Sequence, residues 1–168
     1  MSCKILRLFM MVLALVSLLA CGQESPTPKT PGKAVPDAKA PDFTLKDLSG
    51  KSVKLSSLKG NPVLVIFSAT WCPECRREIP YFKEIYATYY TKGLQIINVD
   101  IMEPEERVRI FADRHELPYR TLLDEEGRVA EKYGVYGIPT TLLIDKNGMI
   151  LCYPCRSLDR LLDMIFAK

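Results

Sequence analysis

Two cysteines separated by two residues follow directly on an apolar segment of the chain. The motif Trp71-Cys72-Pro73-Glu74-Cys75 comes a few residues after the run at 63–67. A buried strand that turns into a helix here would place Cys72 at the helix start. Unpaired backbone N–H groups and the positive end of the helix dipole favour a thiolate at that position. Because the thiolate is the reactive species in thiol–disulfide exchange, the motif predicts redox chemistry.

A second pair at the same spacing, Cys152-Tyr153-Pro154-Cys155, lies near the C-terminus. Three interpretations stay open: a local structural disulfide, a second dithiol that exchanges electrons with the first pair, and metal ligands. No histidine follows either pair directly, so the signature of covalent haem attachment is absent from both. The only histidine of the chain, His115, is expected at the surface, and we predict no metal site and no cofactor.

The N-terminal segment reads as a targeting signal. Lys4 and Arg7 precede an uncharged run that ends at Ala20, which is too short to span a bilayer and is typical of a secretory signal peptide at 1–20. Cys21 ends this run as in a bacterial lipobox, so we expect its lipidation. Residues 21–40, with four prolines and no aromatic residue, are predicted to be an extended tether.

Residues 41–168 have the length of one domain with a substantial core. The formal net charge of the chain is +3, and removal of Lys4 and Arg7 with the signal leaves 3 − 2 = +1. No basic block interleaved with aromatic residues is present, so nucleic-acid binding has no support.

The polarity pattern of the domain predicts alternating strands and helices. An N-terminal hairpin is expected at 43–55, and the helix after Cys72 should run to residue 90 with a kink at Pro80. Further strands are predicted at 94–99, 121–123, 140–144 and 149–153, and further helices at 104–115 and 129–133 and after Ser157. This order gives an α/β domain with a mixed sheet flanked by helices.

The motifs resemble those of one family when they are taken together. Pro80 lies five residues beyond Cys75, Gly137-Ile138-Pro139-Thr140 precedes a strand, and Ala40-Pro41-Asp42-Phe43 opens the domain. In this order they match the thioredoxin fold and resemble the ResA/TlpA-like extracytoplasmic thiol–disulfide oxidoreductases. The resemblance covers essentially all of residues 40–168.

The resemblance implies roles for individual residues. Cys72 would be the nucleophile and Cys75, one turn further along the helix, the more shielded resolving thiol. Arg76 or Arg77 would favour the thiolate. Pro139 matches a cis-proline that faces the disulfide, and Ile138 with Trp71 would contact the substrate.

Glu78 matches a glutamate that ResA-like proteins keep near the cysteines. A half-buried carboxylate there would raise the thiol pKa values and shuttle a proton. Ile66 occupies the strand position at which thioredoxins carry a buried aspartate, so Glu78 is our candidate for the proton-handling group. The alternative is a solvated helix charge. Glu74, beside the thiols, opposes thiolate formation, which favours a reductant over a disulfide-forming oxidant.

The expected function is that of a membrane-tethered thiol–disulfide oxidoreductase on the periplasmic side of a bacterial membrane. The resemblance implies disulfide-containing extracytoplasmic proteins, including apocytochrome c, as substrates and a membrane thiol carrier of the DsbD/CcdA type as electron donor. A peroxiredoxin-like thiol peroxidase is one alternative, although Ala69 stands three residues before Cys72, where that family needs Thr or Ser. A thiolate metal carrier is the other.

Overall fold

The computed structural model of the protein describes residues 36–167. The predicted signal peptide, Cys21 and nearly all of the predicted tether lie outside these residues. No helix between residues 36 and 167 combines the length and apolarity needed to cross a membrane.

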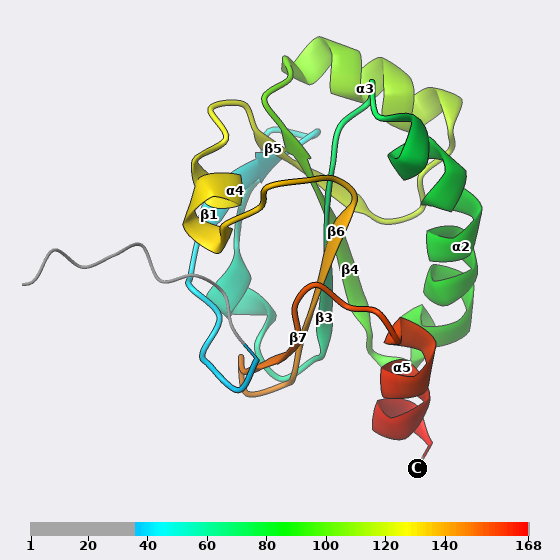
Figure 1. Ribbon diagram of the computed structural model, residues 1–168. Helices are drawn as coiled ribbons and strands as arrows, with labels where there is room; N and C mark the ends of the chain where they lie inside the picture. The colour runs from blue at the N-terminus through cyan, green and yellow to red at the C-terminus, as the bar shows by residue number, and fades with distance from the viewer. Residues whose placement is uncertain (1–35, 168) are drawn as a thin grey trace, which may run out of the picture.

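A single mixed sheet forms the centre of the domain (Figure 1). Its strand order is β2-β1-β5-β4-β3-β6-β7, in which β3, β4 and β5 are parallel and the remaining pairs are antiparallel. The strands are β1 (Thr44–Asp47), β2 (Ser52–Lys54), β3 (Val63–Ser68), β4 (Gln95–Ile101), β5 (Arg120–Asp124), β6 (Thr140–Ile144) and β7 (Ile150–Cys152). The predicted mixed sheet with an N-terminal hairpin is confirmed.

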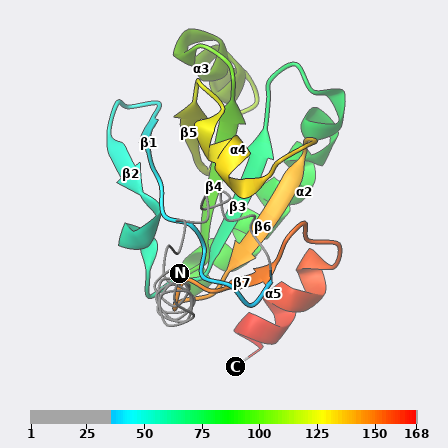
Figure 2. The same cartoon turned by 60° about the vertical axis from the view of Figure 1, so that its left-hand side comes forward.

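Helices cover both faces of the sheet. They are α2 (Pro73–Tyr89), α3 (Glu105–Arg114), α4 (Arg128–Tyr133) and α5 (Leu158–Phe166), with short 3-10 turns η1 (Leu55–Leu58) and η2 (Tyr90–Lys92). Figures 1 and 2 show α2 and α5 together on one face, α4 on the opposite face, and α3 at one end of the sheet.

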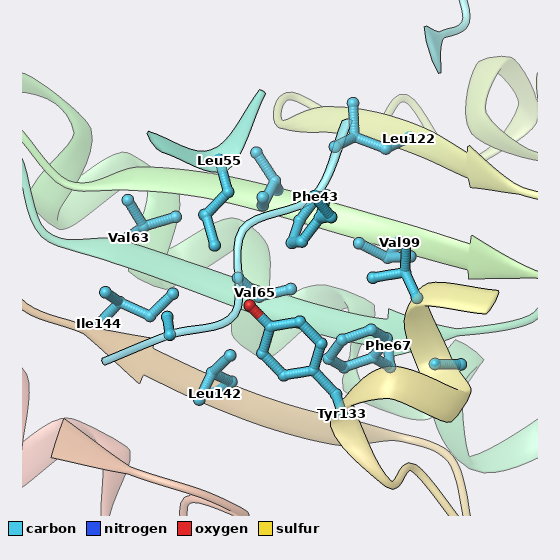
Figure 3. Close-up of a cluster of buried hydrophobic side chains, with 14 of the residues drawn as sticks. Phe43, Leu55, Val63, Val65, Phe67, Val99, Leu122, Tyr133, Leu142 and Ile144 are labelled. Carbon is cyan, nitrogen blue, oxygen red and sulfur yellow. The ribbon is translucent and has the colours of Figure 1, made fainter. Parts of the chain in front are cut away.

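Two hydrophobic clusters lie on opposite faces of β3, because alternate residues of a strand point to opposite sides. Val63, Val65 and Phe67 join the cluster around Tyr133, whose hydroxyl donates to the Pro41 carbonyl at 2.6 Å (Figure 3). The even-numbered residues of β3 pack instead against α2 and α5. Burial on both faces explains why β3 reads as an unbroken apolar run.

Two local features of the helices refine these predictions. Helix α2 continues through Pro80, although proline provides no N–H for the helical hydrogen bond at that position, so Pro80 does not end the helix. Ser157 does stand at the N-cap of α5, but its side chain makes no capping hydrogen bond. The amphipathic face of α5 instead docks through Leu158 and Leu162, which are both buried.

Candidate redox site

Cys72 and Cys75 form a disulfide at the start of α2, with their Cα atoms 5.3 Å apart. Cys72 is the N-cap residue and Pro73 occupies the first turn, where its missing N–H is not needed. The Cys75 backbone N–H donates to Cys72 Sγ at 3.1 Å. One of the unpaired donors of the helix start therefore points at the sulfur that we predicted to be the nucleophile.

The two sulfurs differ in surroundings rather than in exposure. Cys72 is 4% exposed and Cys75 is 6% exposed, so the expectation of a markedly more shielded Cys75 is not met in the disulfide state. Cys75 instead lines a cavity of about 20 Å³ between α2 and the sheet, together with Ser68 and Asn98. A space of this size holds about one water molecule. Cys75 thus adjoins a polar internal site.

The arginines after the motif do not bond to the nucleophile. Arg77 pairs with Glu74, and Arg76 donates from Nη1 to the Thr70 carbonyl at 3.1 Å. Any effect of Arg76 or Arg77 on the Cys72 thiolate would therefore act through the electrostatic field and not through a direct hydrogen bond, and their predicted role stays a prediction. The polar contact recorded at Cys72 Sγ from within α2 is the backbone donor of Cys75.

The loop before β6 closes over the disulfide. The Ile138–Pro139 peptide bond is cis, and the Ile138 carbonyl oxygen lies 3.8 Å from Cys72 Sγ. Pro139 also lines the cavity beside Cys75. Trp71 is 61% exposed, so its indole faces outward beside the pair. The Ile138–Pro139 loop thus lies against the cysteine pair, while Trp71 precedes Cys72 in the chain and lines a groove beside α3.

Glu78 is half-buried on α2, one turn beyond Cys75. Burial raises the pKa of its carboxyl above the usual range for glutamate. Among the described residues, Glu78 forms no ion pair. These features fit the half-buried carboxylate expected from the sequence better than a solvated helix charge.

A buried acidic pair behind the motif was not predicted. Asp100 and Glu103 are 2% and 4% exposed. The Glu103 carboxylate accepts from the Thr70 backbone N–H at 2.5 Å and from Thr70 Oγ1 at 2.7 Å, which fixes the loop that leads into Cys72. Arg107 Nη1 lies 3.5 Å from Glu103. Burial, and secondarily the neighbouring Glu103, raises the pKa of Asp100 to about 8.

The register of the sheet connects this pair to Cys75. Ser68 lies beside Asp100 in the parallel β3–β4 pairing, and Ser68 Oγ donates to Asn98 Oδ1 at 2.7 Å. Ser68 and Asn98 line the cavity at Cys75. Asp100 Oδ1 and Thr121 Oγ1, both buried on this part of the sheet, have no hydrogen-bond partner in the described chain. Cys75, Ser68 and Asn98 thus share one cavity, and Asp100 lies beside Ser68 in the strand register.

Cys152 and Cys155 form a second disulfide between β7 and α5. The Cys155 N–H donates to the Thr141 carbonyl of β6 at 3.2 Å, and both cysteines pack against the α2-side core. The bond therefore lies close in the fold to the strand that carries Pro139. Between residues 36 and 167, no three His, Cys, Asp or Glu side chains are placed to hold a metal ion together.

A disulfide-bonded Cys-x-x-Cys at a helix start, facing a cis-proline loop on a mixed sheet, defines the class of thioredoxin-fold dithiol proteins. Within that class, the model of the AhpC/TSA family matches residues 36–152, and the chain belongs to this family.

Known proteins similar to the chain carry thiol–disulfide names. It is 42% identical over 111 residues to the thiol-disulfide oxidoreductase ResA of Geobacillus thermodenitrificans, a match that covers 66% of this chain and 64% of that protein. The thioredoxin domain of a thiol-disulfide oxidoreductase from Bacteroides vulgatus is 30% identical, with a TM-score of 0.71 over 79% of this chain and 96% of that domain. A thiol:disulfide interchange protein from Bacteroides sp. is 29% identical, with a TM-score of 0.73 over 80% of this chain and 92% of that one. The predicted thioredoxin fold and ResA-like resemblance are confirmed.

Proposed function

We propose that the protein is a thiol–disulfide oxidoreductase that reduces disulfides of other proteins through Cys72 and Cys75. One observation carries the proposal: the Cys72–Cys75 disulfide lies at the α2 N-terminus, with the Ile138 carbonyl 3.8 Å from Cys72 Sγ. An extended substrate segment that bonds to the backbone beside Pro139 would bring its own sulfur to Cys72.

The reaction proceeds in two exchanges. The Cys72 thiolate attacks one substrate sulfur, forming a mixed disulfide and releasing the other substrate sulfur as a thiolate that takes up a proton. Cys75 then loses its proton and attacks Cys72 Sγ, which forms the Cys72–Cys75 bond and releases the second substrate thiolate. The substrate gains two electrons and the enzyme ends oxidised. A dithiol donor must return two electrons and two protons.

The direction of this reaction is tested by the reduction potential of the Cys72–Cys75 pair. We expect a value well below the roughly −120 mV of a strong oxidant such as DsbA, because the half-buried Glu78 opposes thiolate formation, while Glu74 is paired with Arg77. Equilibration with glutathione buffers, in a Cys152→Ser/Cys155→Ser background, measures this pair alone. A protein with such a low potential should also catalyse the reduction of insulin by dithiothreitol. A potential near −120 mV would overturn the assignment as a reductase.

Glu78 is the first proton-handling group in this mechanism. With Glu78→Gln we expect the apparent thiol pKa values to fall by about one unit, because a nearby carboxylate no longer opposes the thiolate. The optimum of the pH–rate profile for insulin reduction should move to lower pH. Alkylation rates of the reduced protein across pH measure the shift.

Glu84→Gln is the matched control for this substitution, since Glu84 is an exposed carboxylate further along α2. It should leave the thiol pKa values unchanged. Unchanged thiol pKa values and turnover in Glu78→Gln would instead assign Glu78 to the solvated surface.

Asp100 is the second proton-handling group that we propose. Its raised pKa, near neutral pH, suits an acid–base group, and Ser68 and Asn98 link its region to the cavity at Cys75. Its ionised form, which gains population as the pH approaches 8, would accept the Cys75 proton in the second exchange, and the protonated form would return it when the disulfide is reduced again.

The cellular setting is a further part of the proposal. Basic residues, an apolar run and Cys21 support export and lipid anchoring on the periplasmic side of a bacterial membrane. Extracytoplasmic disulfide proteins, including apocytochrome c, are the proposed substrates, with a membrane thiol carrier of the DsbD/CcdA type as donor. The match to this chain spans 64% of the length of the Geobacillus thermodenitrificans ResA protein.

A thiol peroxidase is weakly supported. Ala69, three residues before Cys72, is 1% exposed and offers no hydroxyl to a peroxide. Consumption of hydrogen peroxide at a rate comparable to insulin reduction would favour that alternative.

A further inference from the structure

A groove of about 320 Å³ lies directly beside the redox pair, between the active-site loop and α3. The loop contributes Thr70 and Trp71, and Arg76 reaches it from α2. One stripe of α3 forms the opposite wall with Arg107, Ile110 and Arg114. Thr70-Trp71-Cys72 is continuous chain, so the groove adjoins the nucleophile.

The groove carries positive charge. Arg107 is matched by the buried Glu103, so this pair is close to neutral. Neither Arg76 nor Arg114 lies within ion-pair distance of a carboxylate in the described part of the chain. Both are exposed, and no acidic side chain lines the groove. Two guanidinium groups therefore face this space without a carboxylate partner.

Apolar side chains are exposed between these charges. Trp71 is 61% exposed and Ile110 is 53% exposed, and both side chains line this one groove. The His115 and Phe111 rings pack in a tilted arrangement, with ring centroids 4.3 Å apart, and both residues line the same groove. Exposed apolar surface bordered by charge is typical of a protein contact site.

The dimensions suit a short stretch of polypeptide. Arg107 and Arg114 are seven residues apart on a helix, which corresponds to roughly 10 Å at 1.5 Å per residue. An extended chain covers that distance in about three residues. A substrate whose cysteine is bonded to Cys72 would therefore lay about three neighbouring residues across Trp71 and along α3.

We infer that this groove binds an acidic segment flanking the target cysteine of a protein substrate, with carboxylates at Arg76 and Arg114 and an apolar residue on Trp71 and Ile110. The inference rests on the proposed disulfide reductase function and adds to it a preference among substrates. Arginine suits this role because its planar fork pairs with carboxylates and also stacks on aromatic faces.

Peptide substrates of equal length test this inference. Each carries one intermolecular disulfide, and the residues flanking its cysteine are Glu-rich, Gln-rich or Lys-rich. For the full chain we expect KM to be lowest for the Glu-rich peptide and to rise with salt, since exposed ion pairs are screened. Arg114→Glu should raise KM for the Glu-rich peptide about five- to tenfold and leave its kcat unchanged. The same variant should lower KM for the Lys-rich peptide. Arg114→Gln should have an intermediate effect.

Arg109→Glu is the matched control, because Arg109 is also exposed on α3 but pairs with Glu105 and does not line the groove. It should leave the order of the three peptides unchanged. Equal effects of Arg109→Glu and Arg114→Glu, or no preference among the peptides, would overturn the inference. A third outcome would also overturn it: Arg114→Glu abolishes binding of the protein to vesicles of anionic lipid, but the variant keeps the preference for the Glu-rich peptide.

The neutral disulfide of 2-mercaptoethanol separates the two levels of the proposal. Its reduction should be the same in the unmodified protein, Arg114→Glu and Arg109→Glu. Failure of the unmodified protein to reduce it would contradict the proposed function itself. Normal reduction without a charge preference would contradict only the groove.

Discussion

With Cys75→Ser we expect multiple turnover to fall to background while the first attack by Cys72 continues. Serine lacks the thiolate that resolves the mixed disulfide, so substrate accumulates on Cys72. Insulin reduction should drop at least a thousandfold, the scale expected when a nucleophile acting directly on the reacting atoms is removed. Mass spectrometry of the non-reduced protein should detect the substrate bound covalently to Cys72.

Cys72→Ser is expected to lose both turnover and the covalent adduct, because Cys75 Sγ lines the internal cavity instead of the Ile138 side of the site. Retention of the adduct in Cys72→Ser would reverse the roles that we assign to the two cysteines.

The double variant Cys152→Ser/Cys155→Ser is the matched control for the first pair. If the second disulfide is only a local link between β7 and α5, insulin reduction stays within about twofold of the unmodified protein. Removal of the disulfide that closes this short loop lowers the free energy of unfolding by about 2 kcal/mol in the chain-entropy model. A loss of turnover comparable to that of Cys75→Ser would establish an electron relay between the two pairs.

The sequence predicted the central strands and the cysteine motif because their signals are local. Burial of β3 on both faces leaves an unbroken apolar run, and a strand followed by Cys72 and Pro73 indicates a helix start. The Pro139 loop was predicted through resemblance, since nothing in the composition of Gly137-Ile138-Pro139 places it against Cys72.

The buried acids and the groove were not predictable in this way, because they depend on non-local packing. Asp100 lies at the end of β4 and Glu103 lies just after it, at a strand end where acidic residues are ordinarily solvated. They are buried because β4 lies beside β3 and the Thr70 loop folds onto Glu103. Thr70 is 33 residues from Glu103 in sequence. The sequence did carry one signal for this pair: two acidic residues, Asp100 and Glu103, come just after the strand predicted at 94–99. The α3 groove likewise exists only once α3 docks beside Trp71.

Asp100→Asn should change the pH dependence of stability. In the folded protein the Asp100 pKa is raised from 3.8 to about 8, so between these values the folded state holds a proton that the unfolded chain has released. Stability contributed by this group is therefore present at low pH and is lost as pH rises toward 8, with a limiting slope of about 1.4 kcal/mol per pH unit. Asparagine does not titrate, so the variant should lack this loss.

Urea unfolding at several pH values between 5 and 9 measures the difference. Relative to the unmodified protein, Asp100→Asn should gain up to about 4 kcal/mol between pH 5 and pH 8, the product of that slope and three pH units. Asp113→Asn is the control, because Asp113 is exposed on α3. This variant should change the free energy of unfolding by the same amount at low and at high pH. A constant offset between Asp100→Asn and the unmodified protein would mean that Asp100 is ionised throughout. The carboxylate would then be too weak a base to take the Cys75 proton, and the proposed role of Asp100 would fail. If the pH-dependent gain is found, the same variant should slow release of the mixed disulfide, because the Cys75 proton loses its acceptor.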